Sequence, residues 1–199
     1  MARSRRRWGW HELEPEWADR LVDLAAIRPG QLVLDIGAGR GAITAALVAA
    51  GARVVAVELH PQRAETLRRR FADDAVTVVR TDAADLRLPR RPFRVVANPS
   101  FAGSSAVVRR LVAPGSRLVA AHLVLQQQAA VRWSAPDAPG AGRWHRTFDA
   151  RPGAIVPRSA FRPPPRVDTT VLVIERRSTP PTGRSGAGRS QPGRRRTRP

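Results

Sequence analysis

Residues 33–41 read VLDIGAGRG, and this stretch decides the fold. An apolar run ends in the acid Asp35, and Gly37, Gly39 and Gly41 then alternate with other residues. Glycines at such a turn let the backbone bend tightly and approach a ligand that a Cβ atom would obstruct. The stretch therefore predicts a strand, a tight turn and a helix that together bind a nucleotide.

The spacing of the glycines indicates which nucleotide binds. Dinucleotide enzymes carry G-x-G-x-x-G, whereas here G-x-G-x-G follows Asp35. A second acid, Glu58, ends the next apolar run, about 20 residues on, where an acid that binds ribose is expected. A carboxylate only accepts hydrogen bonds, and the ribose diol supplies two donors. The pattern favours S-adenosylmethionine over NAD, with Asp35 and the glycines around its amino-acid part and Glu58 on its ribose.

Apolar runs alternate with helical patterns over the first 125 residues. Strands are expected at 31–36, 53–58, 75–79, 93–97 and 118–125, and helices at 15–27, 41–50, 61–72, 103–113 and 126–133. Such alternation predicts a mainly parallel sheet with helices on both faces. Two more strands are expected at 147–156 and 170–174. They follow a segment rich in Pro, Gly and Ala, 134–142, that indicates a mobile connection.

Polar side chains end four successive expected strands: Asp35, Glu58, Asp82 and Asn98. Sheets of this kind bind ligands outside the carboxyl ends of their strands. A role in the core does not explain acids at strand ends. We expect Asp82, with the backbone of Ala83, to contact the amino group of the cofactor's adenine, and Asp85 is a nearby alternative.

The fourth strand end carries the sequence NPSF at residues 98–101. An aromatic amine such as adenine N6 is a poor nucleophile, because its lone pair is delocalised into the ring. The side-chain oxygen of Asn98 and the carbonyl of Pro99 can accept its two hydrogens and draw the nitrogen towards tetrahedral geometry, while Phe101 stacks on the base. Positioning against the sulfonium methyl then does most of the work, without a metal or a strong base. The alternative is an ordinary Asn-Pro turn.

Composition bounds the partners of the protein. The 199 residues carry a formal net charge of +19, and Arg stands at every Lys/Arg position. A positive charge of this size favours the binding of polyanions. Because Arg both pairs with phosphate and stacks on bases, nucleic acid is the first expected partner. A codon bias towards Arg accounts for the absence of Lys but not for the excess of base over acid.

Several classes of site are excluded by composition. The chain has no Cys, which excludes disulfides, zinc ribbons and iron–sulfur clusters, and its four His lack ligand spacing, so no metal is expected. No apolar run reaches membrane-spanning length. We expect a cytoplasmic monomer with no membrane partner. Its expected parts are a basic arm at 1–12, one domain at 13–177 and a disordered Arg-rich tail at 178–199.

The motifs together resemble those of the ribosomal RNA adenine N6-methyltransferases, which include the erythromycin-resistance methylases and the small-subunit dimethyladenosine transferases. The resemblance runs from about residue 8 to residue 176. It rests on residues 35–41 (DIGAGRG), called the glycine loop below, and on VEL at 57–59, DA at 82–83 and NPSF at 98–101. The most discriminating motif is FRPPPRVDT at 161–169. It implies S-adenosylmethionine as the cofactor and an α/β fold: the class I methyltransferase form of the Rossmann sheet, mainly parallel with an antiparallel final strand.

The resemblance also assigns residues. Phe161 is implied to cover the face of the target base opposite Phe101, and the alternative is a core anchor for the proline-rich loop. His11 and Leu13 match two positions of a Gln-Asn/His-Phe-Leu segment that closes over the cofactor. Two departures stand out. Ser100 replaces the usual third-position Pro of the catalytic motif, and the Arg-rich tail stands where the family carries a helical domain.

The implied activity is methylation of adenine N6 in 23S ribosomal RNA, with protection against macrolide, lincosamide and streptogramin antibiotics. Three alternatives remain open: a small-subunit ribosomal RNA dimethyltransferase, a DNA adenine methylase, and a catalytically impaired RNA-binding factor. RNA affinity is expected to come largely from Arg clusters within 3–7, 68–70 and 194–196. Such contacts make binding strongly dependent on salt and carry little sequence information.

Overall fold

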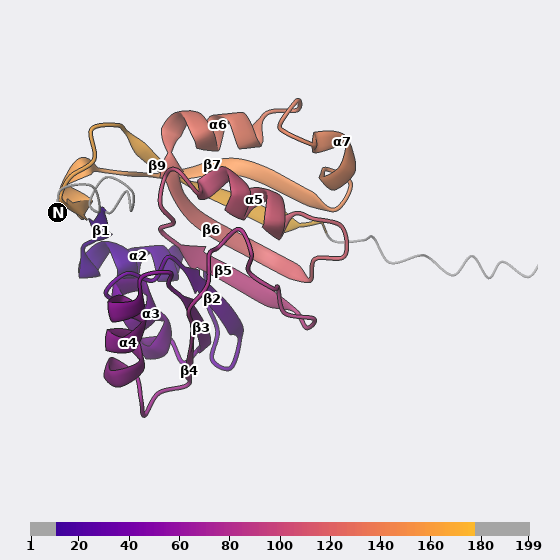
Figure 1. Ribbon diagram of the computed structural model, residues 1–199. Coiled ribbons are helices and arrows are strands. Elements are labelled where there is room, and N and C mark those ends of the chain that lie inside the picture. The colour runs from indigo at the N-terminus through magenta and orange to yellow at the C-terminus, as the bar shows by residue number, and fades with distance from the viewer. Residues whose placement is uncertain (1–10, 178–199) are drawn as a thin grey trace, which may run out of the picture.

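The computed structural model describes residues 11–177, so the Arg-rich tail and all but the last two residues of the expected arm lie outside the described residues. Seven strands form one mixed sheet in the order β4-β3-β2-β5-β6-β9-β7 (Figure 1). Their bounds are β2 Leu32–Ile36, β3 Arg53–Val57, β4 Val76–Val79, β5 Phe93–Ala97, β6 Leu118–Gln126, β7 Phe148–Val156 and β9 Thr169–Arg176. The first five are parallel, and β9 pairs antiparallel with both β6 and β7. The expected parallel sheet with a reversed final strand is confirmed.

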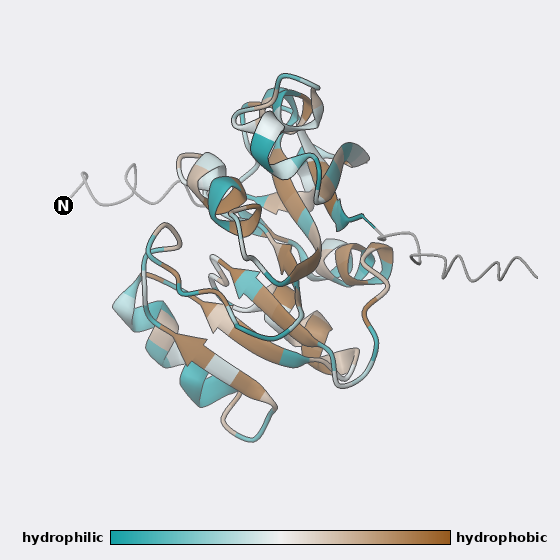
Figure 2. Cartoon of the chain, turned by 90° about the vertical axis from the view of Figure 1, so that its right-hand side faces the viewer, coloured by the Kyte–Doolittle hydropathy of each residue, from teal (hydrophilic) through white to brown (hydrophobic). Residues whose placement is uncertain are grey.

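Helices cover both faces of this sheet (Figure 1). The helices α2 Pro15–Leu24, α3 Ala42–Ala49 and α4 Pro61–Arg70 lie on one face, and α5 Ser104–Leu111, α6 Gln127–Ser134 and α7 Ala141–Trp144 on the other. Alternate residues of each strand face opposite layers, so Val33 packs in the cluster under α2 and α3, whereas Leu34 packs in the cluster under α5 and α6. Figure 2 shows the strands as mainly hydrophobic and the helices as polar on their outer sides.

A two-stranded sheet, which the sequence did not predict, joins the start of the described chain to the segment between β7 and β9. Strand β1 Glu12–Leu13 pairs antiparallel with β8 Phe161–Arg162, with Glu12 opposite Arg162 and Leu13 opposite Phe161. Glu14 and Arg162 form an ion pair beside it. A short 3-10 helix, Arg158–Ala160, precedes β8. The pairing fixes the segment before α2 at the carboxyl edge of the large sheet.

The segment 134–142, expected to be a mobile connection, packs against the rest of the fold. Ala138 and Ala141 are buried. The indole of Trp144 donates a hydrogen bond to the carbonyl of Pro139 at 3.1 Å, and its ring lies 6.3 Å from that of Trp133. The two tryptophans fold the Pro- and Ala-rich segment onto the sheet face that α6 covers.

Between residues 11 and 177, no helix is long and apolar enough to cross a membrane. The same residues contain no group of three or more His, Cys, Asp or Glu side chains that could hold a metal ion.

Candidate active site

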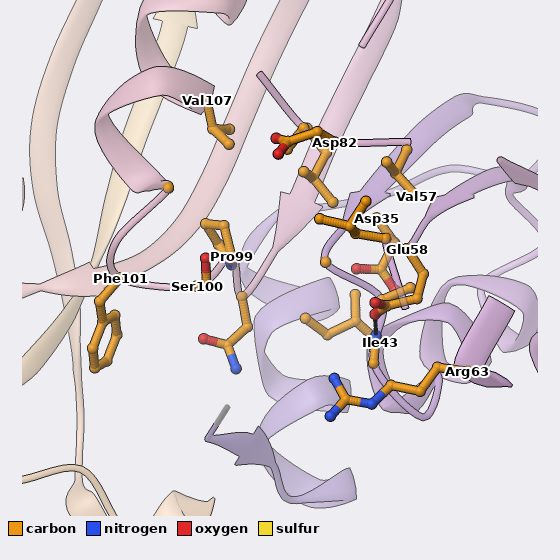
Figure 3. A pocket seen from close by; sticks show the side chains of 18 of the residues that line it. Asp35, Ile43, Val57, Glu58, Arg63, Asp82, Pro99, Ser100, Phe101 and Val107 are labelled. Carbon is orange, nitrogen blue, oxygen red and sulfur yellow. Dashed lines mark hydrogen bonds between the residues drawn. The ribbon is translucent and has the colours of Figure 1, made fainter. Parts of the chain in front are cut away.

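A cavity of about 570 Å³ opens at the carboxyl ends of β2, β3 and β5 (Figure 3). The four strand-end residues predicted to meet there do so: Asp35, Glu58, Asp82 and Asn98 all line it. Other predicted site residues that line the cavity are His11, Leu13, Gly37, Gly39, Ala83, Pro99 and Phe101. Gly41 and Phe161 do not line it.

The carboxylate of Glu58 is held by the backbone of two loops. The N–H of Gly39 donates to Oε2 at 2.9 Å, and the N–H of His60 donates to Oε1 at 2.8 Å. The side chain is buried, yet it lines the cavity. A carboxylate offers about four lone-pair positions, so each oxygen keeps capacity to accept a further hydrogen bond from a diol.

The glycine loop and the NPSF loop touch each other at Gly37. This residue has φ +82°, and a Cβ there would lie 3.4 Å from the Cα of Pro99 and 3.6 Å from the carbonyl oxygen of Asn98. Any side chain at this position would thus be strained and would fill the space between the two loops. Gly37 therefore keeps a gap in the cavity wall between the two motifs.

Gly41 has a different role from the expected one. Its φ is +88° at the start of α3, and a Cβ would lie 2.8 Å from side-chain atoms of both Leu67 and Phe71. Gly41 allows α3 and α4 to pack closely, and it is not part of the cavity wall.

Asp35 lies at the floor of the cavity and is fully buried. The hydroxyl of Thr44 donates to its Oδ2 at 2.7 Å, whereas Oδ1 has no hydrogen-bond partner among the described residues. Burial, the largest cause, raises the pKa of Asp35 to about 7; the nearby charge of Glu58 adds to this, and the Thr44 hydrogen bond opposes it. A carboxyl with an unpaired, buried oxygen is suited to meet a cationic group that enters the cavity.

The side-chain amide of Asn98 is oriented by the segment before β1. Its Nδ2 donates to the backbone carbonyl of His11 at 2.8 Å. Because a carbonyl only accepts, this bond fixes which end of the amide is nitrogen and leaves Oδ1 as an acceptor. The loop then turns into α5 through bonds from Gly103 N–H to the Ser100 carbonyl and from the Ser104 hydroxyl to the Phe101 carbonyl.

Phe161 lies in the core and does not line the cavity at which its contact with a target base was expected. Only 1% of the residue is exposed, and it packs in the same apolar cluster as Leu13 and Leu21. Leu13 lies opposite Phe161 across β1 and β8, so the two side chains point to the same face of this small sheet and pack together. The core-anchor alternative describes this residue.

Several lining residues were not assigned from the sequence. Glu12 forms an ion pair with Arg40 at 3.6 Å, and burial raises the pKa of Glu12 while the charges of Arg40 and Arg63 lower it. Figure 3 shows Arg63 extending into the pocket from α4. Leu59, 41% exposed, offers an apolar surface for a flat ring. Of these residues, only Leu59 could have been found from the sequence, because it directly follows Glu58. Glu12 and Arg40 are far apart in the sequence and are brought together only by the fold.

The two acids considered for the third strand end are distinguished by the structure. Asp82 lines the cavity, and its Oδ1 accepts a hydrogen bond from the N–H of Ala84 at 2.9 Å. Asp85 does not line it. Ala83 and Ala84, which follow Asp82, also line the cavity.

Comparison with known proteins gives consistent matches. Residues 3–185 match the family model described as ribosomal RNA adenine dimethylase. The probable ribosomal RNA small subunit methyltransferase A of Methanospirillum hungatei is 38% identical over 180 residues, which cover 82% of this chain and 66% of that protein. The mycinamicin-resistance protein MyrB of Micromonospora griseorubida is 37% identical over 168 residues, 81% of this chain and 52% of MyrB.

The crystal structure of the 23S rRNA methyltransferase ErmE is similar with a TM-score of 0.74 and 25% sequence identity, covering 83% of this chain and 69% of that one. The chain thus spans between about half and two thirds of the length of the curated relatives named here.

Proposed function

Because the chain belongs to the ribosomal RNA adenine dimethylase family and has the α/β class I methyltransferase fold, we propose that it transfers a methyl group from S-adenosylmethionine to N6 of an adenine in ribosomal RNA. One observation carries the proposal. A single cavity brings the amide of Asn98 together with the glycine loop and Glu58, which we call the nucleoside-binding wall. An acceptor for an amine thus lies beside this wall.

The residues of the cavity fit the proposed cofactor. Gly37 leaves open a space that a Cβ would fill, and Asp35 presents a buried oxygen without a partner among the described residues. We assign the amino-acid part of the cofactor to the glycine loop and Asp35, and the ribose hydroxyls to Glu58. The adenine is assigned to Asp82, Ala83 and Leu59. When bound, S-adenosylmethionine supplies an electrophilic methyl group on a cationic sulfur.

Asn98 and Pro99 are the proposed catalytic residues. Asn98 Oδ1 and the Pro99 carbonyl accept hydrogen bonds from the target amine and hold it in line with the methyl group. The bond from Asn98 Nδ2 to His11 stops the amide from rotating, so the acceptor is positioned before the RNA binds. An adenine reaches this point only when it is unpaired or flipped out of its helix.

Within ribosomal RNA we propose 23S as the substrate and protection against macrolide-type antibiotics as the outcome. The identity to MyrB and the likeness to ErmE support this choice. The second candidate is small-subunit ribosomal RNA, which the similar identity to the Methanospirillum hungatei protein favours. Either substrate would place the protein with ribosomes in the cytoplasm, as a monomer whose Arg side chains contact phosphates.

The test is transfer of tritium from labelled S-adenosylmethionine to 23S RNA, 16S RNA and single-stranded DNA offered separately, followed by mapping of the labelled nucleotide. We expect label on adenine N6 of 23S RNA. The variant Asn98→Ala should lose transfer about a hundredfold or more while still binding RNA, and Asp23→Asn, an exposed change on α2 outside the cavity, should not. Label on 16S RNA alone would select the second candidate, label on DNA alone would reject an RNA substrate, and full activity in Asn98→Ala would reject the site.

A further inference from the structure

Two aromatic rings stack on each other at the end of the cavity away from the nucleoside-binding wall. The rings of His11 and Phe101 have centroids 5.5 Å apart and planes inclined by 28°. Both residues line the cavity and are half-buried. Figure 3 shows Phe101 at one end of the pocket and Glu58 and Arg63 towards the other, with Pro99 between them. The stacked pair therefore lies on the side where a substrate base, and not the cofactor, would enter.

The catalytic amide is tied to the same residue. Asn98 Nδ2 donates to the carbonyl of His11, so the backbone that bears the imidazole is one hydrogen bond from the amide that would receive the target amine. The acceptor Asn98 Oδ1 and the imidazole of His11 therefore belong to the same end of the cavity. Phe161, the other candidate for this position, is 1% exposed and packs in the core.

The imidazole can serve as a wall because it is anchored to a neighbouring loop. Its Nδ1 donates to the carbonyl of Pro163 at 2.8 Å, which joins it to the loop after β8. A flat base makes contacts of about 3.5 Å on each face, so a base held between two rings needs about 7 Å between them. The two rings stack on each other with centroids 5.5 Å apart, so one of them must move away from the other before a base can enter.

We propose that His11 is the second wall of the substrate-base site, and that the target adenine inserts between the imidazole of His11 and the phenyl ring of Phe101. This inference rests on the proposed function and reassigns His11 from the cofactor, which the sequence resemblance implied, to the base. Without RNA, each ring covers the stacking face of the other and keeps it from water. Stacking tolerates any planar base, so the pair supplies affinity, while the acceptors at Asn98 and Pro99 select an amine.

The test compares His11→Ala, which keeps the backbone carbonyl, with His11→Phe, which keeps a flat ring. The control is His145→Ala, because His145 also contacts an aromatic ring, that of Trp144 at 4.0 Å, but lies outside the cavity. The probe is a short unstructured RNA with a single 2-aminopurine, whose fluorescence falls when it stacks. S-adenosylhomocysteine is kept saturating, and its affinity for each variant is measured separately by calorimetry.

We expect His11→Ala to bind the probe about tenfold more weakly with most of the quenching lost, and to raise KM for RNA with little change in cofactor affinity. His11→Phe should restore quenching, and His145→Ala should match the wild type. Unchanged quenching in His11→Ala would overturn the inference, and so would a loss of cofactor affinity that accounts for its lost activity. Failure of the proposed function is a separate result, in which the wild type quenches the probe but transfers no methyl group to ribosomal RNA.

Discussion

Replacing Asp35 by Asn should change how the stability of the protein depends on pH. Burial raises the pKa of Asp35 to about 7, whereas an unfolded chain releases this proton near pH 3.9. The folded state therefore keeps the proton that the unfolded state has lost, so the free energy of unfolding falls as pH rises from about 4 to about 7 and is level above that. Each pKa unit is worth about 1.4 kcal/mol, and the fall between pH 5 and pH 8 is about 3 kcal/mol.

Asparagine at position 35 removes this pH-dependent fall in the free energy of unfolding, but it also destabilises the folded state by an amount that is the same at every pH. Its oxygen can still accept the hydroxyl of Thr44, but its –NH₂ takes the place of Oδ1, which has no partner among the described residues. An unsatisfied buried donor costs about 1–3 kcal/mol at every pH. The variant should therefore be about as stable as the wild type at pH 5 and about 2 kcal/mol more stable at pH 8.

The assay is urea unfolding followed by tryptophan fluorescence, for both proteins at pH 5 and pH 8. Other groups also titrate in this range or just below it, including His122, whose pKa burial lowers to about 4. They are present in both proteins, so the difference between the proteins isolates Asp35. A stability difference that is the same at the two pH values would refute the buried, proton-holding carboxyl.

Four further outcomes follow from the structure. Cofactor affinity should be about tenfold weaker at pH 6 than at pH 8 in the wild type, because the cationic ligand favours ionised Asp35, and calorimetry should find no such change in Asp35→Asn. Glu58→Gln should weaken cofactor binding about 10- to 100-fold through loss of charged hydrogen bonds, and unchanged affinity would remove Glu58 from the ribose site. Gly41→Ala should lower the free energy of unfolding by about 3 kcal/mol, from positive φ and overlap with α4, and a thermal scan that matches wild type would contradict the packing role. Phe161→Leu should cost about 1 kcal/mol of stability and leave kcat unchanged, whereas a large fall in kcat at full stability would return this ring to the base site.

The central strands and the glycine loop were predictable because strong local sequence signals mark where they begin and end. Apolar runs of strand length end at Gly or at a polar residue, so β2, β3 and β5 begin and end within about one residue of the expected positions. The meeting of Asp35, Glu58, Asp82 and Asn98 followed from the parallel order alone, since the carboxyl ends of neighbouring strands share an edge.

The remaining features depend on contacts between distant segments. β1 and β8 have two residues each, too few for any periodicity to show. Whether Phe161 lies in the cavity wall or in the core depends on how β1 and β8 pack against the helices and the large sheet, which no local pattern specifies. The choice between Asp82 and Asp85 depends on the turn that the Asp82 carboxylate makes with Ala84 N–H. Thr44, which bonds Asp35, was not assigned from the sequence, although it is the only polar residue of helix α3.

The pairing of β1 with β8 has a consequence for synthesis of the protein. His11 is held by Pro163, a residue 152 positions further along the chain, and Glu12 and Leu13 pair with residues at a similar separation. Contacts that span so much sequence form late, because the loop between them must be ordered first. A nascent polypeptide can form the parallel strands β2 to β6 before β8 and Pro163, which bind His11 and strand β1, have been synthesised. The end of the cavity that His11 and Asn98 share is therefore incomplete until residues 161–163 have left the exit tunnel.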